Sequence, residues 1–365
     1  MPLIVKRLTV RSHSVQAGFS LVELLVGLVI GLLVILVVMQ VFSEFEGQKR
    51  TTMGTADAQT NGNIALYNVQ RDAQLAGYGL PVFSKTNSPL LCGTLTTEGV
   101  SASVNDLSPI TITDGGTGAG ASDSVIVRYG TTPLGGVPVA IGGPTVTSAP
   151  AVKVGVVNNM GCQNGDVAIV TNLPSCVLTK VKSITGTTEI ELKNGTGVTS
   201  GAGISCMGGW NSFTYAVNNS QLERNGTPNV ADIVNMQAQY GISAAGNNNK
   251  ITAWVDATGT TWDPATMTVA DRNRIKAVRI AIVARNGLLE KENVTTACSS
   301  TSAANPTGLC AWDATSASPA TTSPAPTIDL SKINGVDNPD WQRYRYRVYE
   351  TIIPIRSMIW SKDAL

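Results

Sequence analysis

The pattern of hydrophobic positions changes twice along this chain of 365 residues. An apolar run without a charged residue extends from Leu24 to Phe42. As a helix rising about 1.5 Å per residue, the run would be about 28 Å long, which is enough to cross the hydrocarbon core of a bilayer. The run therefore predicts a membrane-spanning helix.

Small and apolar residues then recur at steps of three or four, which is typical of one face of a helix. This stripe comprises Ala58, Gly62, Ala65, Val69, Ala73 and Ala76. Gly77 is a suitable C-cap, and Gly79 and Pro81 are expected to end the helix. Three glycines in the connecting stretch, Gly47, Gly54 and Gly62, predict a bend or a loosened turn. We expect residues 19–43 to span the membrane and residues 44–80 to continue as the spine of a globular domain.

Beyond Pro81 the pattern changes to the period of two that favours strands, separated by Gly, Pro and Asn turns. The predicted strands are 124–129, 152–157, 167–171, 177–184, 188–192, 278–284 and 344–353. Short helices are predicted at 230–240 and at 268–274, the latter capped by Thr268 with Asp271 three residues on. The fold class is therefore α+β, with a long N-terminal helix packed on an antiparallel, strand-rich domain at 81–365.

Three further segments are interpreted as connections. Residues 115–120 are rich in glycine, but they neither follow a clear strand nor open a helix, so a flexible loop is favoured over a phosphate-binding loop. Residues 256–263 lack the ligand spacing of a calcium loop and are interpreted as a hairpin turn. Residues 295–326, rich in Ser, Thr, Ala and Pro, are expected to form a long surface loop.

The distribution of charged residues predicts how the chain is oriented in the membrane. The chain has 26 basic and 25 acidic residues. The segment before the apolar run, 1–18, contains Lys6, Arg7 and Arg11 and no acid, which predicts that the N-terminus is cytoplasmic and the remainder lies outside. Without 1–18 the chain carries 23 basic and 25 acidic residues, a balance that argues against nucleic acid as the main partner. The alternating Arg and Tyr residues at 343–347 are interpreted as a solvated strand face.

All the cysteines follow the apolar run, at Cys92, Cys162, Cys176, Cys206, Cys298 and Cys310. Six cysteines on one side of a membrane segment indicate disulfides in an oxidising compartment such as the periplasm. The alternative is a set of buried free thiols. Proximity predicts the pair Cys298–Cys310, whereas the pairing of the other four stays open.

The boundary before the run carries a processing motif. Gly18 and Phe19 precede the run, and Glu23 stands at its start. This arrangement resembles the processing site of type IV prepilins, in which the leader is removed and the hydrophobic helix stays on the product. The resemblance implies cleavage after Gly18 by prepilin peptidase and methylation of the new amine of Phe19. The chain departs from the pattern of the major pilins, which usually carry a proline within this helix, because its apolar run contains none.

Three later segments sharpen the resemblance. Residues 66–80, LYNVQRDAQLAGYGL, resemble the end of the spine helix in the PilW family of minor type IV pilins. Residues 232–243 with 275–287, and the ending 346–356, are similar to that family's central helix and strand and its closing strand. Residues 85–225 match no motif. The resemblance implies a structural component that helps to initiate a pilus and sits at or near its tip.

The expected partners are other minor pilins, the major pilin, prepilin peptidase and the inner-membrane assembly platform, with a tip adhesin as a further candidate. Glu23 is the expected assembly residue. A carboxylate in lipid costs several kcal/mol, so a neighbouring subunit's terminal ammonium would neutralise it. The alternative is a glutamate that reaches the membrane interface.

Two rival functions remain. A type II secretion pseudopilin would share Gly18, Phe19 and Glu23. A membrane-tethered periplasmic enzyme or binding protein would need a site of convergent polar groups. The only histidine, His13, precedes the cleavage site, and no G-x-S-x-G stretch occurs, so neither catalysis, a metal nor a cofactor is expected.

Overall fold

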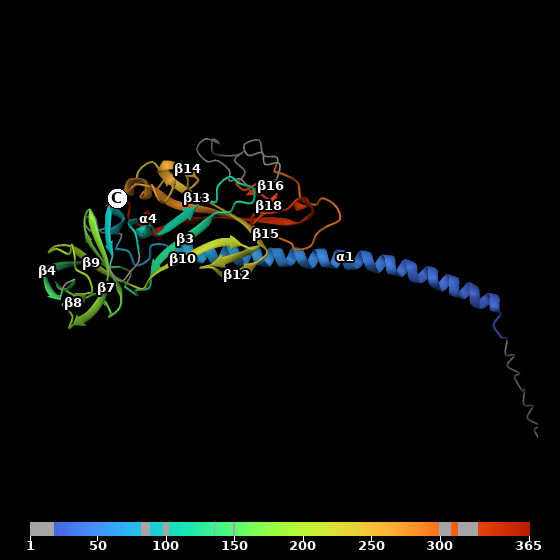
Figure 1. Ribbon diagram of the computed structural model, residues 1–365, viewed down its shortest axis with the longest axis horizontal. Helices are drawn as coiled ribbons and strands as arrows, with labels where there is room; N and C mark the ends of the chain where they lie inside the picture. Colours follow the sequence, from blue (N-terminus) through green and yellow to red (C-terminus); the bar gives the residue numbers. More distant parts are fainter. Residues whose placement is uncertain are drawn as a thin grey trace, which may run out of the picture. The chain divides into compact units, whose positions relative to one another are not determined.

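The computed structural model describes residues 18–81, 88–97, 102–134, 136–148, 150–298, 308–312 and 328–365 (Figure 1). The predicted leader lies outside these residues except for Gly18, and so does most of the predicted loop at 295–326. The chain divides into two units, Met1–Met53 and Gly54–Leu365, and each is described by itself.

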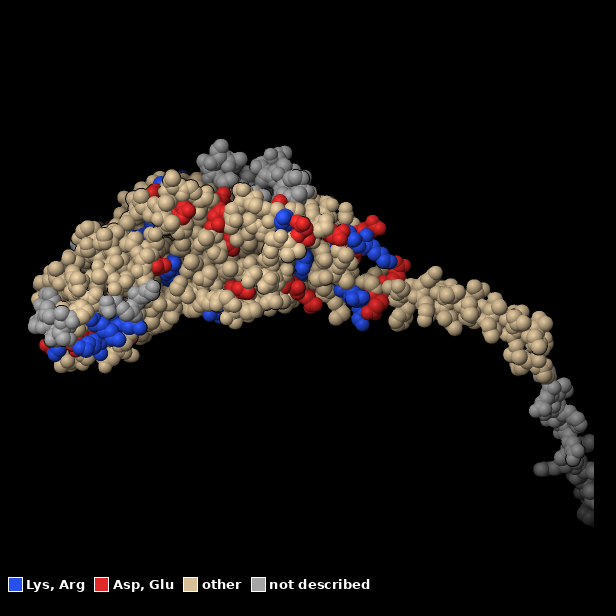
Figure 2. Space-filling model, in the orientation of Figure 1, with Lys and Arg blue, Asp and Glu red and all other residues tan. Residues whose placement is uncertain are grey.

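The first unit contains the start of helix α1, which runs from Leu21 to Gln74. The hydroxyl of Ser20 accepts a hydrogen bond from the backbone N–H of Val22 at 3.2 Å, which satisfies one of the free donors of the first turn. The side chains of the apolar run are all exposed, and Figure 2 shows no charged residue on the drawn face of this stretch. Within the described residues, α1 is the helix long and apolar enough to cross a membrane. This surface therefore needs a covering of lipid or of other apolar helices.

The second unit contains the rest of α1, and the predicted stripe is buried there. Ala58, Gly62, Ala65, Val69 and Ala73 all face the interior. The helix ends at Gln74, and Gly77 and Gly79 follow with φ values of +77° and +88°, as helix-terminating glycines do. The predicted stripe is confirmed from Ala58 to Ala73, whereas the helix ends at Gln74, before Ala76 and the predicted cap at Gly77.

One of the two effects predicted for the glycines of α1, a loosened turn, does not occur, whereas the bend stays a prediction. Every residue from Leu21 to Gln74 is α-helical, so the loosened turn was a wrong prediction. A Cβ added at Gly54 would overlap the side chain of Asn286, and one added at Gly62 would overlap the ring of Tyr349. The two glycines are thus places where side chains from the sheet approach the helix backbone closely.

Helix α1 packs against a four-stranded antiparallel sheet. Its order is β14-β13-β15-β20. The strands are β14 (Ile251–Val255), β13 (Ile233–Ser243), β15 (Ile275–Arg285) and β20 (Tyr346–Pro354). The phenol of Tyr349 donates to the backbone carbonyl of Gln59 on α1 at 3.3 Å. The strands predicted at 278–284 and 344–353 are confirmed, although β20 begins two residues late.

Strand β13 replaces the helix predicted at 230–240, so that prediction was wrong. Met236, Ala238 and Tyr240 enter the main hydrophobic core, and the intervening Asn235 and Gln237 point to the opposite face. Both amides donate to the carbonyl of Ala121, at 2.7 and 3.0 Å. Helix-forming residues therefore sit in a strand because all of its residues are buried and the polar ones find partners there.

A five-stranded antiparallel sheet packs beside the first. Its order is β12-β11-β10-β3-β2. The strands are β12 (Thr227–Ala231), β11 (Gln221–Arg224), β10 (Trp210–Asn218), β3 (Ser124–Gly130) and β2 (Ile110–Thr113). Residues 115–120 connect β2 to β3 as a loop, as predicted. Strands β3 and β10 pair with Gly130 opposite Trp210, although 79 residues separate these two partners.

These intervening residues form a closed barrel. The strands are β4 (Val139–Ser148), β5 (Ala151–Val156), β6 (Val167–Asn172), β7 (Ser175–Thr185), β8 (Glu189–Leu192) and β9 (Gly203–Gly208). Their order is β7-β6-β9-β4-β5-β8, and β8 pairs back with β7, which closes the ring. The barrel has a hydrophobic cluster of its own. The strands predicted at 152–157, 167–171, 177–184 and 188–192 are confirmed and all belong to it. Strand β1 (Thr94–Thr97) adds to β7 in parallel.

The remaining elements are short. They are α2 (Gly259–Trp262), α3 (Val269–Arg272), α4 (Arg356–Trp360), β16 (Gly308–Leu309), β17 (Ile328–Asp329), β18 (Lys332–Ile333), β19 (Val336–Asp337), η1 (Pro89–Leu91), η2 (Val104–Leu107), η3 (Trp341–Arg343) and η4 (Lys362–Ala364). Helix α3 confirms a prediction, because the hydroxyl of Thr268 accepts from Asp271 N at 3.2 Å.

Two predictions near these elements were wrong. A turn of helix, α2, stands where a hairpin turn was expected. Arg343 lies in η3 and Arg345 precedes β20, so the five residues 343–347 are not one alternating strand. Each arginine instead reaches the loop after β15: Arg343 Nε donates to the carbonyl of Glu290, and Arg345 Nε to its carboxylate, both at 2.8 Å.

Candidate functional site

The predicted processing and assembly residues lie together at the start of α1. Gly18 and Phe19 precede the helix, and Phe19 is 77% exposed. A Cβ at Gly18 would meet no atom of this chain within 4 Å, so nothing in the fold itself requires glycine there. Glu23 is exposed in the first turn, where an acid interacts favourably with the helix dipole. Among the described residues no ion pair forms to Glu23.

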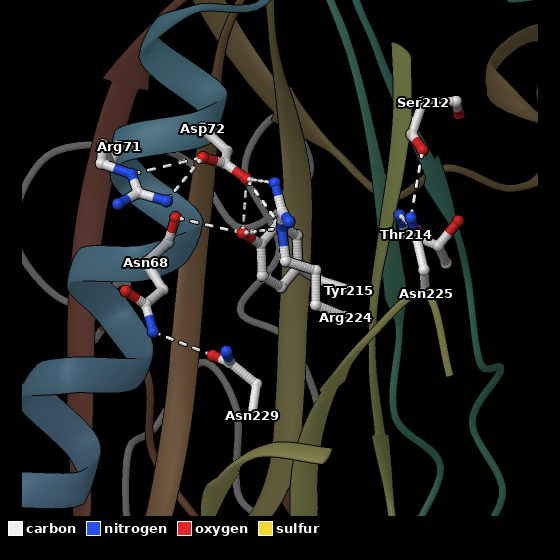
Figure 3. Close-up of polar contacts among 9 residues, drawn as sticks. All are labelled: Asn68, Arg71, Asp72, Ser212, Thr214, Tyr215, Arg224, Asn225 and Asn229. Atoms are coloured by element: carbon white, nitrogen blue, oxygen red, sulfur yellow. Dashed lines mark hydrogen bonds and ion pairs between the residues drawn. The ribbon is translucent and has the colours of Figure 1, made fainter. Parts of the chain in front are cut away.

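A second polar site lies at the other end of α1, where the helix docks on β10 and β11 (Figure 3). Asp72 is 1% exposed. Its Oδ2 accepts from the phenol of Tyr215 at 2.7 Å and from Nε and Nη2 of Arg224 at 3.0 and 2.8 Å. Arg71 Nη2 approaches Oδ1 at 3.3 Å. The buried carboxylate is therefore well supplied with donors, which is the condition under which such a group is tolerated.

Two local features of the sequence bring the residues of this site together. Asp72 falls on the buried stripe of α1, three residues after Val69, so helical periodicity turns it toward the sheets. Tyr215 and Arg224 are directly opposite each other in the antiparallel pair β10–β11, so both reach the same carboxylate. The guanidinium of Arg224 also lies 3.7 Å from the ring centroid of Phe213, which restricts its position.

The electrostatics of the site follow from this geometry. Burial raises the pKa of Tyr215, and the hydrogen bond to Asp72 and its negative charge raise it further, so the phenol keeps its proton. Sliding α1 by one residue would separate Asp72 from both partners. The cluster therefore sets the register of the helix on the globular domain.

Backbone contacts fix the chain just after α1. Gly77 N donates to the carbonyl of Arg128 at 2.8 Å, and Gly130 N donates to the carbonyl of Tyr78 at 2.6 Å. The hydroxyl of Ser357, in α4, donates to the carbonyl of Ala76 at 3.0 Å. A Cβ at Gly77 would overlap Ser357, so this position needs glycine both for its positive φ and for space. These bonds hold the turn that follows α1 against β3 and the C-terminal segment.

The cysteines form three disulfides. They are Cys92–Cys176, Cys162–Cys206 and Cys298–Cys310. The second lies within the barrel, and the first joins the barrel to the segment before β1. The sequence left these two pairs open because nothing local brings their members together; they are 84 and 44 residues apart.

The described residues contain no group of three or more His, Cys, Asp or Glu that could hold a metal ion. A hollow in the globular unit is lined by Asp114, Asp256 and Asp263, among other residues. Nearby, burial raises the pKa of Asp123 to about 7, against the opposing effect of backbone N–H donors from Gly115 and Ala238. Asp123 Oδ2 accepts from Ala238 N at 2.7 Å, so this carboxyl joins β13 to the start of β3.

Comparison with known families matches two parts of the chain. Residues 13–39 match the prokaryotic N-terminal methylation motif. Residues 210–357 match the type IV pilus-assembly protein W family. The N-terminal part of the chain therefore carries a prepilin-type methylation motif, and the C-terminal part of the globular domain is similar to the PilW family. No curated protein and no solved structure matches it.

The PilW match extends from β10 to the start of α4, so it includes Tyr215, Arg224 and Ser357, three residues that hold the spine helix. Asp72 itself lies on α1, outside both matched parts. Sequence reasoning noted the motif around Asp72 but gave the residue no role, although an acid on an otherwise apolar stripe was a usable signal. The barrel lies in the gap between the two matched parts.

Proposed function

We propose that this chain is a minor pilin of a type IV pilus, which helps to initiate assembly and stays at or near the tip. One observation carries the proposal: an exposed, uncharged helical surface begins at a prepilin motif and continues, in the same helix, into a spine locked to the PilW region through Asp72. Such a helix can leave the membrane only if other apolar helices replace the lipid around it.

Processing comes first in the proposed sequence of events. Prepilin peptidase cuts after Gly18 and methylates the new amine of Phe19. The exposure of both residues ahead of α1 supports access by a membrane-embedded enzyme. The basic segment 1–18 is then cytoplasmic, α1 crosses the inner membrane once, and the globular domain is periplasmic, a compartment in which disulfides persist.

Assembly follows through Glu23. In a bundle of apolar helices its carboxylate pairs with the terminal ammonium of a neighbouring subunit, and the pair selects the register of packing more than it adds affinity. The partners are other minor pilins, the major pilin and the inner-membrane assembly platform, with a tip adhesin as a further candidate.

Two measurements test this function. Co-purification from membranes should recover pilins with the wild-type chain; recovery of secretion-machine components instead would favour a type II secretion pseudopilin. Intact mass should show that wild type has lost residues 1–18, whereas Gly18→Leu keeps them. A Gly18→Leu protein shortened like wild type would place the cleavage site elsewhere.

The barrel suggests a second role in the same protein, as a binding module carried by the pilus. It interrupts two strands that pair with each other, has its own core, and lies outside both family matches. Replacing 132–208 by a short turn, together with Cys92→Ser, should leave association with pilins intact and abolish a surface-binding activity. A complete loss of pilin association would instead make the barrel part of the assembly interface.

A further inference from the structure

A cleft of about 380 Å³ opens beside α1 at the C-terminal end of β15. Thr55 and Ala58 of the helix form one wall, and the other is formed by Asn286, Val294 and residues 345–348. All of these belong to the globular unit. The walls include aliphatic surface from Ala58 and Val294, and the rim carries two guanidinium groups.

One buried donor in this cleft has no acceptor. Asn286 is 3% exposed, and its Oδ1 accepts from Leu288 N at 2.9 Å, which fixes the orientation of the amide. Its Nδ2 has no hydrogen-bond partner among the described residues. A buried donor left without an acceptor costs about 1–3 kcal/mol, so such a group is expected to receive one from a ligand or partner.

The rim has a spare positive charge. Arg345 is paired with Glu290, Nε to Oε1 at 2.8 Å. Arg347, two residues further along, is exposed and forms no hydrogen bond or ion pair with any described residue of the globular unit. Glu290, the acid on this side of the cleft, is already paired with Arg345. An incoming acceptor would therefore meet one buried amide donor and one free guanidinium.

We propose that this cleft receives an Asp or Glu side chain of a neighbouring pilin, whose carboxylate binds Asn286 Nδ2 and Arg347. The two oxygens of a carboxylate can accept from both donors at once, and the aliphatic walls suit the methylene stem that carries it. The cleft is partly formed by α1, the element that the proposed function places among neighbouring subunits, and the inference rests on that function.

The test uses the full chain in native membranes and the pilins that co-purify with wild type. Asn286→Asp keeps the size of the side chain and the acceptor for Leu288 N, but replaces the donor by a charged oxygen that repels a carboxylate. Arg347→Gln removes the free charge. Each should lower pilin recovery at least tenfold at an unchanged thermal midpoint, whereas Arg347→Lys should retain much of it. Arg356→Gln, at an exposed arginine outside the cleft, is the matched control.

Equal recovery from wild type, Asn286→Asp and Arg347→Gln would overturn the inference and indicate that water alone occupies the cleft. Absence of pilins even from the wild-type preparation would instead contradict the proposed function. If Asn286→Asp does not fold, a photo-crosslinking residue at position 347 replaces it. Crosslinks beside an Asp or Glu of a pilin support the inference, and crosslinks to lipid alone, or none, overturn it.

Discussion

The ring of Tyr349, on β20, lies against the backbone of α1 at Gly62, at a place where any larger residue would overlap it. The contact is part of one packing pattern. Gly54, Ala58 and Gly62 follow each other at four-residue steps, so they form a shallow groove along the helix that faces the four-stranded sheet. Close approach, and not flexibility, is the role of these glycines.

Gly62→Ala should therefore destabilise the globular unit by about 1–3 kcal/mol, because the new methyl group forces the ring or the helix to move. Gly47→Ala is the matched control, since a Cβ there meets nothing within 4 Å and the helix gains up to about 1 kcal/mol in propensity. Chemical unfolding of the two variants measures the difference. Equal stability would show that the sheet adapts to the methyl group without cost.

Substituting Arg224 and substituting Asp72 should lower the free energy of unfolding by different amounts. Arg224→Gln leaves a carboxylate that is 2% exposed without its main cation, and should cost about 3–5 kcal/mol. Asp72→Asn leaves a guanidinium that is 31% exposed and can reach water, so its cost should be smaller. Unfolding free energies of both single variants and of the double variant give the coupling. A larger loss of unfolding free energy from Asp72→Asn than from Arg224→Gln would contradict this expectation, because the unpaired guanidinium would then be the costlier group.

Asp123 should make stability depend on pH. Its folded-state pKa, about 7, lies above the ordinary value of 3.8, so between these values the folded protein holds a proton that the unfolded chain has lost. The unfolding free energy should therefore fall as the pH rises through this window, by about 4 kcal/mol at most, and level off above it. Urea titrations of the globular unit between pH 4 and pH 8 measure the slope, and Asp123→Asn should flatten it. An unchanged slope in that variant would assign the dependence to another group.

Glu23→Ala should separate assembly from processing. The variant helix inserts at least as easily, because a costly carboxylate has gone, and the bond after Gly18 is untouched. Docking into a bundle should fail, since a neighbour's ammonium would be buried without a counter-charge at a cost of about 3–5 kcal/mol.

Processed protein should then accumulate in the membrane with little co-purifying pilin. Full recovery of pilins with a fully processed variant would mean that Glu23 is only an end residue at the membrane interface. Glu44→Ala, on the same helix but beyond the apolar run, is the matched control, because it removes an exposed acid without touching the proposed pair.

Several features followed from the sequence because they depend on neighbouring residues. The apolar run, the buried stripe from Ala58 to Ala73, the glycines after Gln74 and four strands of the barrel all carry their signal within a few positions. The capping of α3 by Thr268 is equally local. The processing motif is a short sequence pattern, and the family match supports it without reference to the fold.

Other features were decided by contacts between residues far apart in the chain. The segment at 233–243 has helix-forming residues, yet pairing with β15 and burial on both faces make it a strand. The barrel closes only when β8 returns to β7, and the disulfide Cys162–Cys206 joins residues that are 44 positions apart in the chain. Asp72 acquires its role because β10 and β11 place Tyr215 and Arg224 opposite it. A local pattern specifies which face of an element is buried, whereas the partner that buries it depends on the packing of the whole unit.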